Sequence, residues 1–336
     1  DQAYEKANTV IQDALKDSPN DPKVNFLKAK LALREENTEQ AIISLRIVTK
    51  ETPENIEAFL LLANVYKSQD NIEQHNSTLN EAYAKNKTNP EGLLILAKYQ
   101  SSRDIVQAEK IIDDYNNAKE SDYDGLSIKA AILNQTKRQS EGYVIAGTLM
   151  EQFADKPNGY LLSVPYLSAT GDKEAAISNL EKGYINTKNN RQILQRLTSL
   201  QASEKQFDIV ENRINAELKA SPGDEELQLL LTKVYLAENN IDDATSVLQD
   251  VVDNDSKSQE AYLTLSQIYM SKEDKAKATA ILEDGYVNAK PNRKILVSLT
   301  KLELLDKEFD SVESRLQSEL EVTPDDEELK LLSVSY

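Results

Sequence analysis

The chain has 336 residues, of which 40% are hydrophobic, and its 57 Asp and Glu exceed its 39 Lys and Arg to give a formal net charge of −18. Such an acidic field repels phosphate groups, which argues against nucleic acid and anionic membrane surfaces as ligands. The sequence contains no cysteine, which excludes disulfides, thiolate catalysis and cysteine-ligated metals. Nine glycines and nine prolines are few for a sheet protein of this length, so helices are expected.

The first predicted element is a single helix near the N-terminus. Apolar residues recur on one helical face over residues 3–16, at Ala7, Ile11 and Leu15. The segment 18–22, Ser-Pro-Asn-Asp-Pro, then breaks the pattern. This helix is predicted to be the second member of a helix pair whose first member is missing.

A helix pair is predicted next, over residues 57–83. Four residues spaced at i, i+3, i+4 and i+7 give its first helix one apolar face, and residues 68–71 interrupt the pattern. The small residues are expected where helices touch, because they permit close approach of the backbones. The first helix carries Phe59, Leu62, Ala63 and Tyr66, and the second carries Ile72, Leu79, Ala82 and Tyr83.

The chain repeats itself further along. The block at 180–194, LEKGYINTKNNRQIL, returns 102 residues later at 282–296 as LEDGYVNAKPNRKIL. Since 102 is three times 34, the chain is interpreted as 34-residue units amplified in groups of three, with Phe59, Tyr160 and Tyr262 as counterparts. We therefore expect one groove surface to recur about every three units, which favours a long or repetitive ligand.

The unit at 260–286 resembles the tetratricopeptide repeat (TPR). Its residues match the family pattern of an aromatic, a Leu followed by a small residue and a Tyr in the first helix, then small residues around a Leu in the second; Pro291 follows near the end. The resemblance implies an all-α, right-handed superhelical solenoid of antiparallel helix pairs. The matching residues are Tyr262, Leu265, Ser266, Tyr269, Ala278, Leu282 and Gly285.

We predict one continuous solenoid over residues 1–336, with about nine repeats and a partial repeat at each end. The approximate units are 20–55, 56–89, 90–122, 123–157, 158–190, 191–223, 224–258, 259–292 and 293–325. Residues 326–332 match the start of the unit at 224 and then stop, so Leu329, Leu331 and Leu332 would present an apolar stripe without a partner. This favours a fragment of a longer array.

The resemblance also implies a binding surface. In the family, first-helix residues line a concave groove that holds a peptide, at the second, fifth, ninth, twelfth and thirteenth places of each unit. We predict a channel for an amphipathic or acidic segment, with lysines supplying local attraction; superhelix packing of the leucines and solvated lysines remain the alternative. The fifth places hold Phe26, Leu60, Leu94, Leu161, Leu229, Leu263 and Val297, and the ninth places hold Lys30, Asn64, Lys98, Lys233, Gln267 and Lys301.

Known catalytic and cofactor patterns are missing. The single histidine, His75, lies where the repeat usually carries Ala, and one histidine without cysteine cannot build a common zinc site. Acidic clusters such as 224–226 open predicted helices, where capping explains them better than a calcium loop does. No glycine-rich phosphate loop occurs. The chain is therefore predicted to be no enzyme, with no catalytic, cofactor or metal site.

The predicted function is a scaffold or adaptor that binds a protein segment or peptide in the groove, without direct membrane insertion. The composition is similar to that of large bacterial arrays that assist exopolysaccharide assembly and export or protein sorting, which favours a bacterial periplasm or envelope; the absence of cysteine fits a cytoplasm equally well. Two alternatives stay open. One is a polysaccharide-binding module that uses some of the 15 tyrosines, and the other is the non-catalytic part of a larger enzyme.

Overall fold

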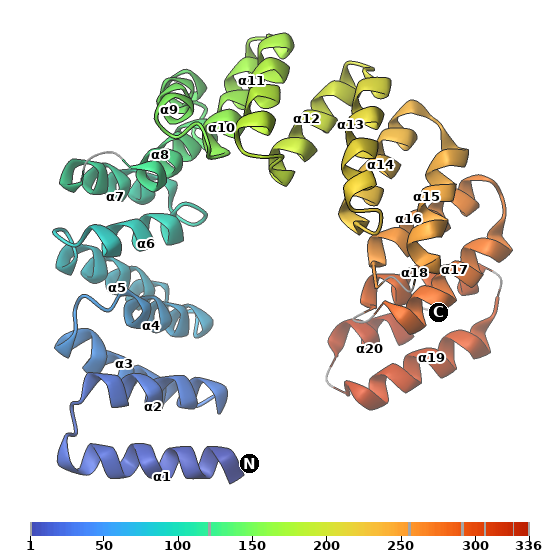
Figure 1. Ribbon diagram of the computed structural model, residues 1–336. Coiled ribbons are helices and arrows are strands. Elements are labelled where there is room, and N and C mark those ends of the chain that lie inside the picture. Colours follow the sequence, from blue (N-terminus) through green and yellow to red (C-terminus); the bar gives the residue numbers. More distant parts are fainter. Residues whose placement is uncertain are drawn as a thin grey trace. The chain divides into compact units, whose positions relative to one another are not determined.

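The computed structural model describes residues 2–119, 122–254, 257–289, 292–305, 307–324 and 326–334. These residues form twenty α-helices and no strand, and the helices follow one another in sequential antiparallel pairs (Figure 1). We call the even-numbered helices α2 to α20 helix A and the odd-numbered helices α3 to α19 helix B. From α2 to α11 and from α13 to α20, each helix packs against the next one in the chain. The predicted all-α, TPR-like class is thereby confirmed.

The chain forms two compact units, Asp1–Leu194 and Gln195–Tyr336, and α12 begins at the end of the first and continues into the second. The first unit holds α1 (Gln2–Asp17), α2 (Pro22–Arg34), α3 (Thr38–Glu51), α4 (Ile56–Ser68), α5 (Ile72–Lys85), α6 (Pro90–Gln100), α7 (Ile105–Ala118), α8 (Tyr123–Gln135), α9 (Gln139–Gln152), α10 (Asn158–Ala169) and α11 (Lys173–Asn186). Then follow α12 (Arg191–Ser203), α13 (Phe207–Ala220), α14 (Glu225–Glu238), α15 (Ile241–Asp253), α16 (Gln259–Ser271), α17 (Lys275–Asn288), α18 (Arg293–Leu305), α19 (Phe309–Val322) and α20 (Glu327–Val334).

Side-chain caps fix where most helices begin. Asp21 accepts a hydrogen bond from the backbone N–H of Val24 at 2.9 Å, and Asn37 accepts one from Gln40 at 3.0 Å. Such caps satisfy N–H groups that have no partner within the helix. The starts of helix A lie within two residues of those predicted for the units, and the division into nine repeats within one continuous solenoid stays a prediction. Equivalent side-chain caps are Asn55, Asn71, Asn89, Asp104, Asp122, Asp172, Asp224, Asn240, Ser258 and Asp274.

The turn from helix A to helix B recurs as a left-handed residue. In eight pairs one residue at this turn has a φ between +55° and +78°, and only Gly171 is a glycine. A left-handed residue ends a helix with a sharp reversal of the chain. It therefore aims each helix B back along its helix A. The other seven residues are Glu36, Asp70, Lys137, Lys205, Asn239, Glu273 and Lys307.

The core consists of apolar seams between neighbouring helices. The counterparts Phe59, Tyr160 and Tyr262 are all buried, each in a helix A. Space for the two tyrosines comes from helix B, because a Cβ atom added at Gly183 would lie 2.5 Å from the ring of Tyr160. The equivalent distance from Gly285 to the ring of Tyr262 is 2.6 Å. The repeated pair of a small residue and an aromatic residue in the sequence therefore serves the packing of helix B against helix A.

Two other sequence features are part of the fold. His75 lies buried in the seam of α4 and α5, where its Nδ1 is 2.8 Å from the carbonyl oxygen of Ala63. Helix α10 contains Pro165 and begins at Asn158, which is the start predicted for that unit. At the last described helix, Leu329 is buried and Leu331 is exposed, whereas the side chain of Leu332 lies outside the described residues.

A search of the described helices for a segment long and apolar enough to cross a membrane finds none.

Candidate binding groove

The predicted groove residues lie in helix A throughout. All seven fifth-place residues are partly buried, and all six ninth-place residues are exposed. Leu60 and Leu94 pack against the core of the first unit, as does Phe26. The leucines therefore contribute to packing and also leave part of their surface accessible, and their role in a ligand channel stays a prediction.

Next to the fifth place, the first unit carries an apolar row that the sequence-based prediction missed, and two of its five members are exposed. Leu27 is 58% exposed and Ile95 is 46% exposed, and both hold the sixth place of their helices. We call the five apolar sixth-place residues of α2 to α10 the apolar ladder. Their spacing of 33 or 34 residues is the signal that could have revealed them. The ladder consists of Leu27, Leu61, Ile95, Ile128 and Leu162.

Three of the four lysines of the predicted groove, Lys30, Lys98 and Lys233, are paired with carboxylates of the next helix A. Lys30 lies 2.8 Å from Glu57, and its ammonium also sits 4.3 Å from the centre of the Phe26 ring. Lys98 lies 3.7 Å from a carboxylate oxygen of Asp124. These pairs partly neutralise the attraction predicted for the lysines. Because the side chains are exposed, each pair contributes only about 0–1 kcal/mol, so a ligand can displace it at small cost.

The polar residues at the ninth places differ in their contacts. The hydroxyl of Tyr99 donates to the side-chain oxygen of Asn64 at 2.5 Å, which links α6 to α4. Gln267 and Lys301 form no hydrogen bond or ion pair with the other described residues.

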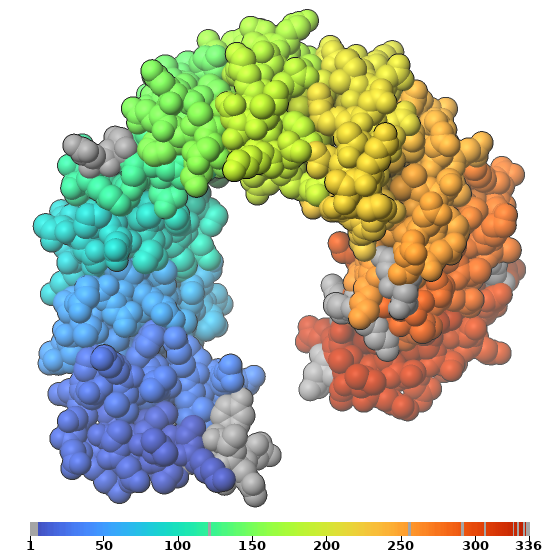
Figure 2. Space-filling model, viewed as in Figure 1, coloured from blue at the N-terminus to red at the C-terminus, as the bar shows by residue number. Residues whose placement is uncertain are grey.

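Side chains fill the gaps between successive helix pairs in each unit (Figure 2), but the second unit has a cavity of ligand size between two of its helices A. This trough, of about 670 Å³, lies between α12 and α14 and reaches α16. Ligand-binding clefts typically measure about 300–1,000 Å³. We call this cavity the trough; its lining is Gln195, Thr198, Ser199, Ala202, Ser203, Glu226, Leu229, Leu230, Lys233, Val234, Ala237 and Glu260.

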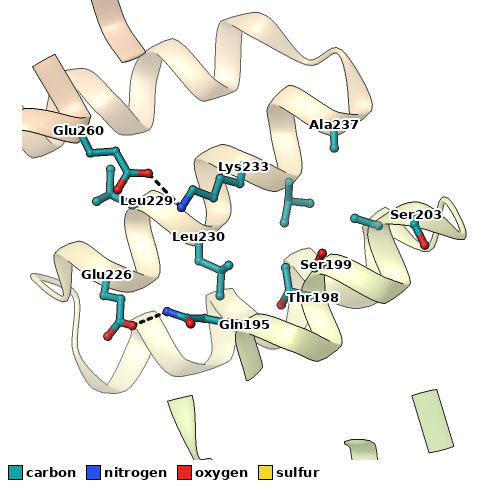
Figure 3. Close-up of a pocket in the computed structure, with 12 residues that line it drawn as sticks. Gln195, Thr198, Ser199, Ser203, Glu226, Leu229, Leu230, Lys233, Ala237 and Glu260 are labelled. Carbon is teal, nitrogen blue, oxygen red and sulfur yellow. Dashed lines mark hydrogen bonds and ion pairs between the residues drawn. The ribbon is translucent and has the colours of Figure 1, made fainter. Parts of the chain in front are cut away.

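Hydrogen bonds and an ion pair hold the rim of the trough. Gln195 donates to a carboxylate oxygen of Glu226 at 2.6 Å, which joins α12 to α14. Lys233 lies 2.9 Å from Glu260, which joins α14 to α16, and both contacts are visible at the rim in Figure 3. Between them, aliphatic side chains of α14 form the floor. The trough is therefore apolar within and charged at its rim.

The trough exists because α12 is short of large side chains. Its fifth and ninth places are Gln195 and Ser199, where the counterparts 102 residues later are Val297 and Lys301. Likewise Ala202 and Ser203 correspond to Leu304 and Leu305. Of the predicted groove residues, the trough unites only Leu229 and Lys233. The recurrence predicted for the groove surface thus fails at α12, while the buried positions recur.

The buried hydroxyl of Thr198, in the wall of the trough, has no hydrogen-bond partner among the described residues. This group could suggest a missing ligand. However, the hydroxyl of its counterpart Thr300 is equally unpartnered among the described residues, although Thr300 lines no such trough. The feature therefore belongs to the repeat and does not define the site.

Most of the tyrosines that pack between helices use their hydroxyls for hydrogen bonds within the chain. Tyr83 donates to Asp114, and Tyr286 donates to Glu319. Burial, followed by the neighbouring carboxylate, raises the pKa of each of these tyrosines to about 12. Burial and the acceptor Glu211 likewise raise the pKa of Tyr235. These hydroxyls are structural, which leaves few tyrosines to bind a sugar.

Among the described residues, no group of three or more His, Asp or Glu could hold a metal ion. Glu109 accepts from Lys129 at 2.8 Å and from Arg138 at 2.7 Å, and the bond from Lys129 is the main reason that its pKa is lowered. This lowers the proton affinity of Glu109, the opposite of what a general acid requires at neutral pH.

Sequential antiparallel helix pairs define the class of this protein: it is an α-helical repeat protein. Residues 235–285, which cover the end of α14 to Gly285, match the family model of the tetratricopeptide repeat. The match covers this stretch alone, and the fold of the chain is an all-α, TPR-like array of helix pairs. No curated protein matches the chain.

Solved structures are similar in fold. The crystal structure of yeast Tom70 aligns with a TM-score of 0.54 at 10% identity, over 98% of this chain and 91% of that chain. A tetratricopeptide repeat protein from Parabacteroides merdae ATCC 43184 has a TM-score of 0.46 at 12% identity, over 84% of this chain and 98% of that chain. The type IV pilus biogenesis factor PilW has a TM-score of 0.44 at 13% identity, over 62% of this chain and 98% of that chain. At such identities the likeness to Tom70 concerns the fold alone.

Proposed function

We propose that this chain is a non-catalytic scaffold that binds a segment of another protein along the helix A side of its repeats. The observation that carries the proposal is the coincidence of two ligand-accepting features on helix A. These are the apolar ladder of the first unit and the trough of the second. Exposed apolar rows and ligand-sized clefts in a soluble chain mark binding surfaces more often than accidents of packing.

The polysaccharide-binding alternative has less support. Sugar binding would use aromatic rings that are open to solvent, but Phe26 is covered by the ammonium of Lys30 and Tyr99 by the guanidinium of Arg103. The hydroxyl of Tyr99 is also occupied by Asn64. A protein segment with apolar side chains complements the ladder better than a sugar does, because it removes apolar surface from water.

The setting proposed for this scaffold is a bacterial envelope, in exopolysaccharide assembly and export or in protein sorting. This part rests on the composition of the chain, which is acidic and free of cysteine. In the alternative setting, the chain is the non-catalytic part of a larger enzyme. The same helix A surface would then hold a substrate protein or a partner domain.

The test compares the two helix types. A double variant, Leu27→Ser with Ile95→Ser, removes the most exposed parts of the apolar ladder. The control double variant, Ile43→Ser with Val106→Ser, removes apolar side chains of similar or greater exposure from helix B. We expect proteins captured by the unaltered chain in quantitative mass spectrometry to be lost with the first variant and kept with the second. Equal retention by both, with circular dichroism showing intact helices, would rule out the helix A surface.

A further inference from the structure

A cleft between two helices B of the first unit is rich in cations. Residues of α3, α4 and α5 line it, and its volume is about 280 Å³. Its charged residues are Arg46 and Lys50 on α3 and Glu81 and Lys85 on α5, a net of +2. Residues 1–194 as a whole hold 23 Lys and Arg and 28 Asp and Glu, a net of −5, and residues 195–336 hold 16 and 29, a net of −13. The cleft is therefore locally basic in an acidic chain.

A buried tyrosine positions the arginine of this cleft. The Nε of Arg46 donates to the hydroxyl of Tyr66 at 2.9 Å, and Tyr66 is only 4% exposed. Among the described residues, the two Nη groups of Arg46 have no hydrogen-bond or ion-pair partner, and the hydroxyl proton of Tyr66 has no acceptor. The N–H groups of a guanidinium form a fork that matches two oxygens of a phosphate or a carboxylate. The cleft thus holds an oriented set of donors for an anion.

The other donors of the cleft are also available. Lys85 forms no ion pair with the described residues, and the side chains of Gln74 and Ser77 donate no hydrogen bond to them. Lys50 lies 3.9 Å from Glu51, and both side chains are exposed, so this contact contributes little. Only Glu81 in the lining opposes an anion, and one carboxylate offsets one of three cations. The balance of the lining therefore favours a negative ligand.

The cations of the cleft are absent from the equivalent places of the repeat. These places lie 101 and 203 residues later, at the spacing that relates Phe59 to Tyr160 and to Tyr262. Neither later copy has a basic residue at any of the three positions. The packing of the repeat therefore does not require the cations. Arg46 is replaced by Gly147 and Gln249, Lys50 by Glu151 and Asp253, and Lys85 by Asn186 and Asn288.

One later copy shows the same contact without a cation. Tyr269, the counterpart of Tyr66, donates its hydroxyl proton to the side-chain oxygen of Gln249 at 3.4 Å. In the first unit the direction is reversed, because Arg46 can only donate. The exchange of glutamine for arginine thus keeps the contact between the helices and leaves both Arg46 and Tyr66 with donors for a ligand.

We propose that this cleft binds a phosphate group, either as inorganic phosphate or as the monoester of a small molecule. A phosphate monoester carries a charge of about −1.5 to −2 at neutral pH and three strong acceptor oxygens. It can therefore accept from the fork of Arg46 and from the ammonium groups of the cleft together, whereas a carboxylate has one charge and two oxygens. The inference goes beyond the proposed scaffold function, because the cleft lies between helices B and takes a small ligand.

Isothermal titration calorimetry of the full chain tests the proposal with three ligands at constant ionic strength. These are inorganic phosphate, glycerol phosphate and acetate. The acidic field of the chain opposes an anion at long range, so we expect a modest Kd for phosphate of about 1 mM or lower. Acetate should bind at least about tenfold more weakly. Binding of either phosphate ligand supports the proposal, and the tighter of the two identifies the source of the phosphate group.

Variants locate the site. Arg46→Gln recreates the pair formed by Gln249 and Tyr269, so the fold should accept it. It should weaken phosphate binding by about tenfold or more, because it removes the charged donor fork. Lys85→Asn, which introduces the residue of the third copy, should weaken binding several-fold. Lys182→Gln on α11 is the matched control, since it removes one exposed positive charge from the same unit outside the cleft and should leave binding unchanged.

Three results would overturn the proposal: no binding of either phosphate ligand, acetate binding as tight as phosphate binding, or equal loss of binding in Arg46→Gln and Lys182→Gln. Circular dichroism verifies that the variants remain helical. The scaffold function is judged separately, by the loss of partners in the Leu27→Ser and Ile95→Ser variant on helix A, so failure of one proposal leaves the other standing.

Discussion

A glycine opposite a buried aromatic ring sets the distance between helices at two equivalent places. Gly183 leaves room for Tyr160, and Gly285 leaves room for Tyr262. Both tyrosines belong to helix A and both glycines to helix B. The contact is between a side chain and a backbone, so the ring has no flexible neighbour that could yield.

This geometry predicts a specific cost for one methyl group. Gly285→Ala should lower the free energy of unfolding by about 1–3 kcal/mol, because the new Cβ overlaps the ring of Tyr262. Gly147→Ala is the control, since a Cβ there meets no atom within 4 Å and the helix gains up to about 1 kcal/mol. Urea unfolding followed by circular dichroism measures both. A Gly285→Ala protein as stable as the unaltered chain would contradict the packing described.

The buried tyrosines predict how stability changes at alkaline pH. In the unfolded chain a tyrosine has a pKa of about 10, whereas burial and the carboxylate neighbours raise the pKa of Tyr83 and Tyr286 to about 12 in the folded chain. Below about pH 10 both states hold the proton, and above it the unfolded state loses the proton first. Stability should therefore be complete below about pH 10 and fall as the pH rises towards about 12.

Urea midpoints at about pH 9 and about pH 11 test this expectation. Replacing both tyrosines by phenylalanine removes their titration, so the loss between the two values should become smaller, even though the variant also lacks two hydrogen bonds. If the loss were as large in the double variant as in the unaltered chain, these two tyrosines would not be its cause.

At the scale of elements, the turn between helix A and helix B repeats a backbone conformation rather than a residue type. Seven non-glycine residues hold the left-handed region there, and Gly171 holds it once with a φ of +78°. A residue with a Cβ atom adopts that region at a cost of about 1–2 kcal/mol. The array therefore contains a small amount of strain at every such turn.

Two substitutions test this strain in opposite directions. Gly171→Ala should destabilise the chain by about 1 kcal/mol, and since no atom lies within 4 Å of the added Cβ, the cost is one of backbone conformation alone. Lys205→Gly relieves the same strain at a φ of +58° and should stabilise the chain by up to about 1 kcal/mol. Thermal unfolding provides the comparison, and shifts of the same sign would contradict it.

One buried ion pair links α18 to α19. Arg315 donates to Glu303 at 2.6 Å, and Glu303 is only 2% exposed. In the preceding group of three units the counterparts are Gln201 and Arg213, which are also hydrogen-bonded. An amide thus serves in one copy where a carboxylate serves in the other.

The pair predicts which substitutions the chain accepts. Glu303→Gln should change the unfolding free energy by no more than about 1 kcal/mol, because the amide can accept the same hydrogen bond. Glu303→Leu should cost about 2–4 kcal/mol, since it leaves a largely buried guanidinium without this partner. Calorimetry of both variants decides the matter: a Leu variant as stable as the Gln variant would mean that Arg315 finds water or another acceptor.

How far the sequence predicts these elements depends on what each position does. Helix periodicity and acidic residues at helix starts such as 224–226 predicted the helices, and the buried counterparts Phe59 and Tyr262 recur as predicted. The left-handed turns were not predicted, because a lysine such as Lys205 gives no signal of a positive φ. The trough was missed because its wall on α12 is made by small residues such as Ser199 and Ala202. A cavity forms where large side chains are missing, and no motif in the sequence marks such a place.

At the scale of the whole molecule, the two units share one architecture and differ in surface chemistry. Contacts between helices require apolar residues at core positions, so these residues recur with the spacing of about 34 residues. Exposed positions of helix A have no such contacts, and their residue types differ between units. The first unit combines an apolar ladder with basic helices A, and the second combines a trough with a net charge of −13. The proposed scaffold function therefore implies ligand segments of different chemistry for the two units.

The most direct test of the scaffold function is site-specific photo-crosslinking in cells. A photoreactive residue placed at Leu27 or Ser199, both on helix A, should form crosslinks to a partner protein. The same residue at Ile43 or at Ala280, on helix B of the corresponding units, should not. Crosslinks from the helix B positions alone, or none from either helix type, would contradict the conclusion that helix A holds the ligand.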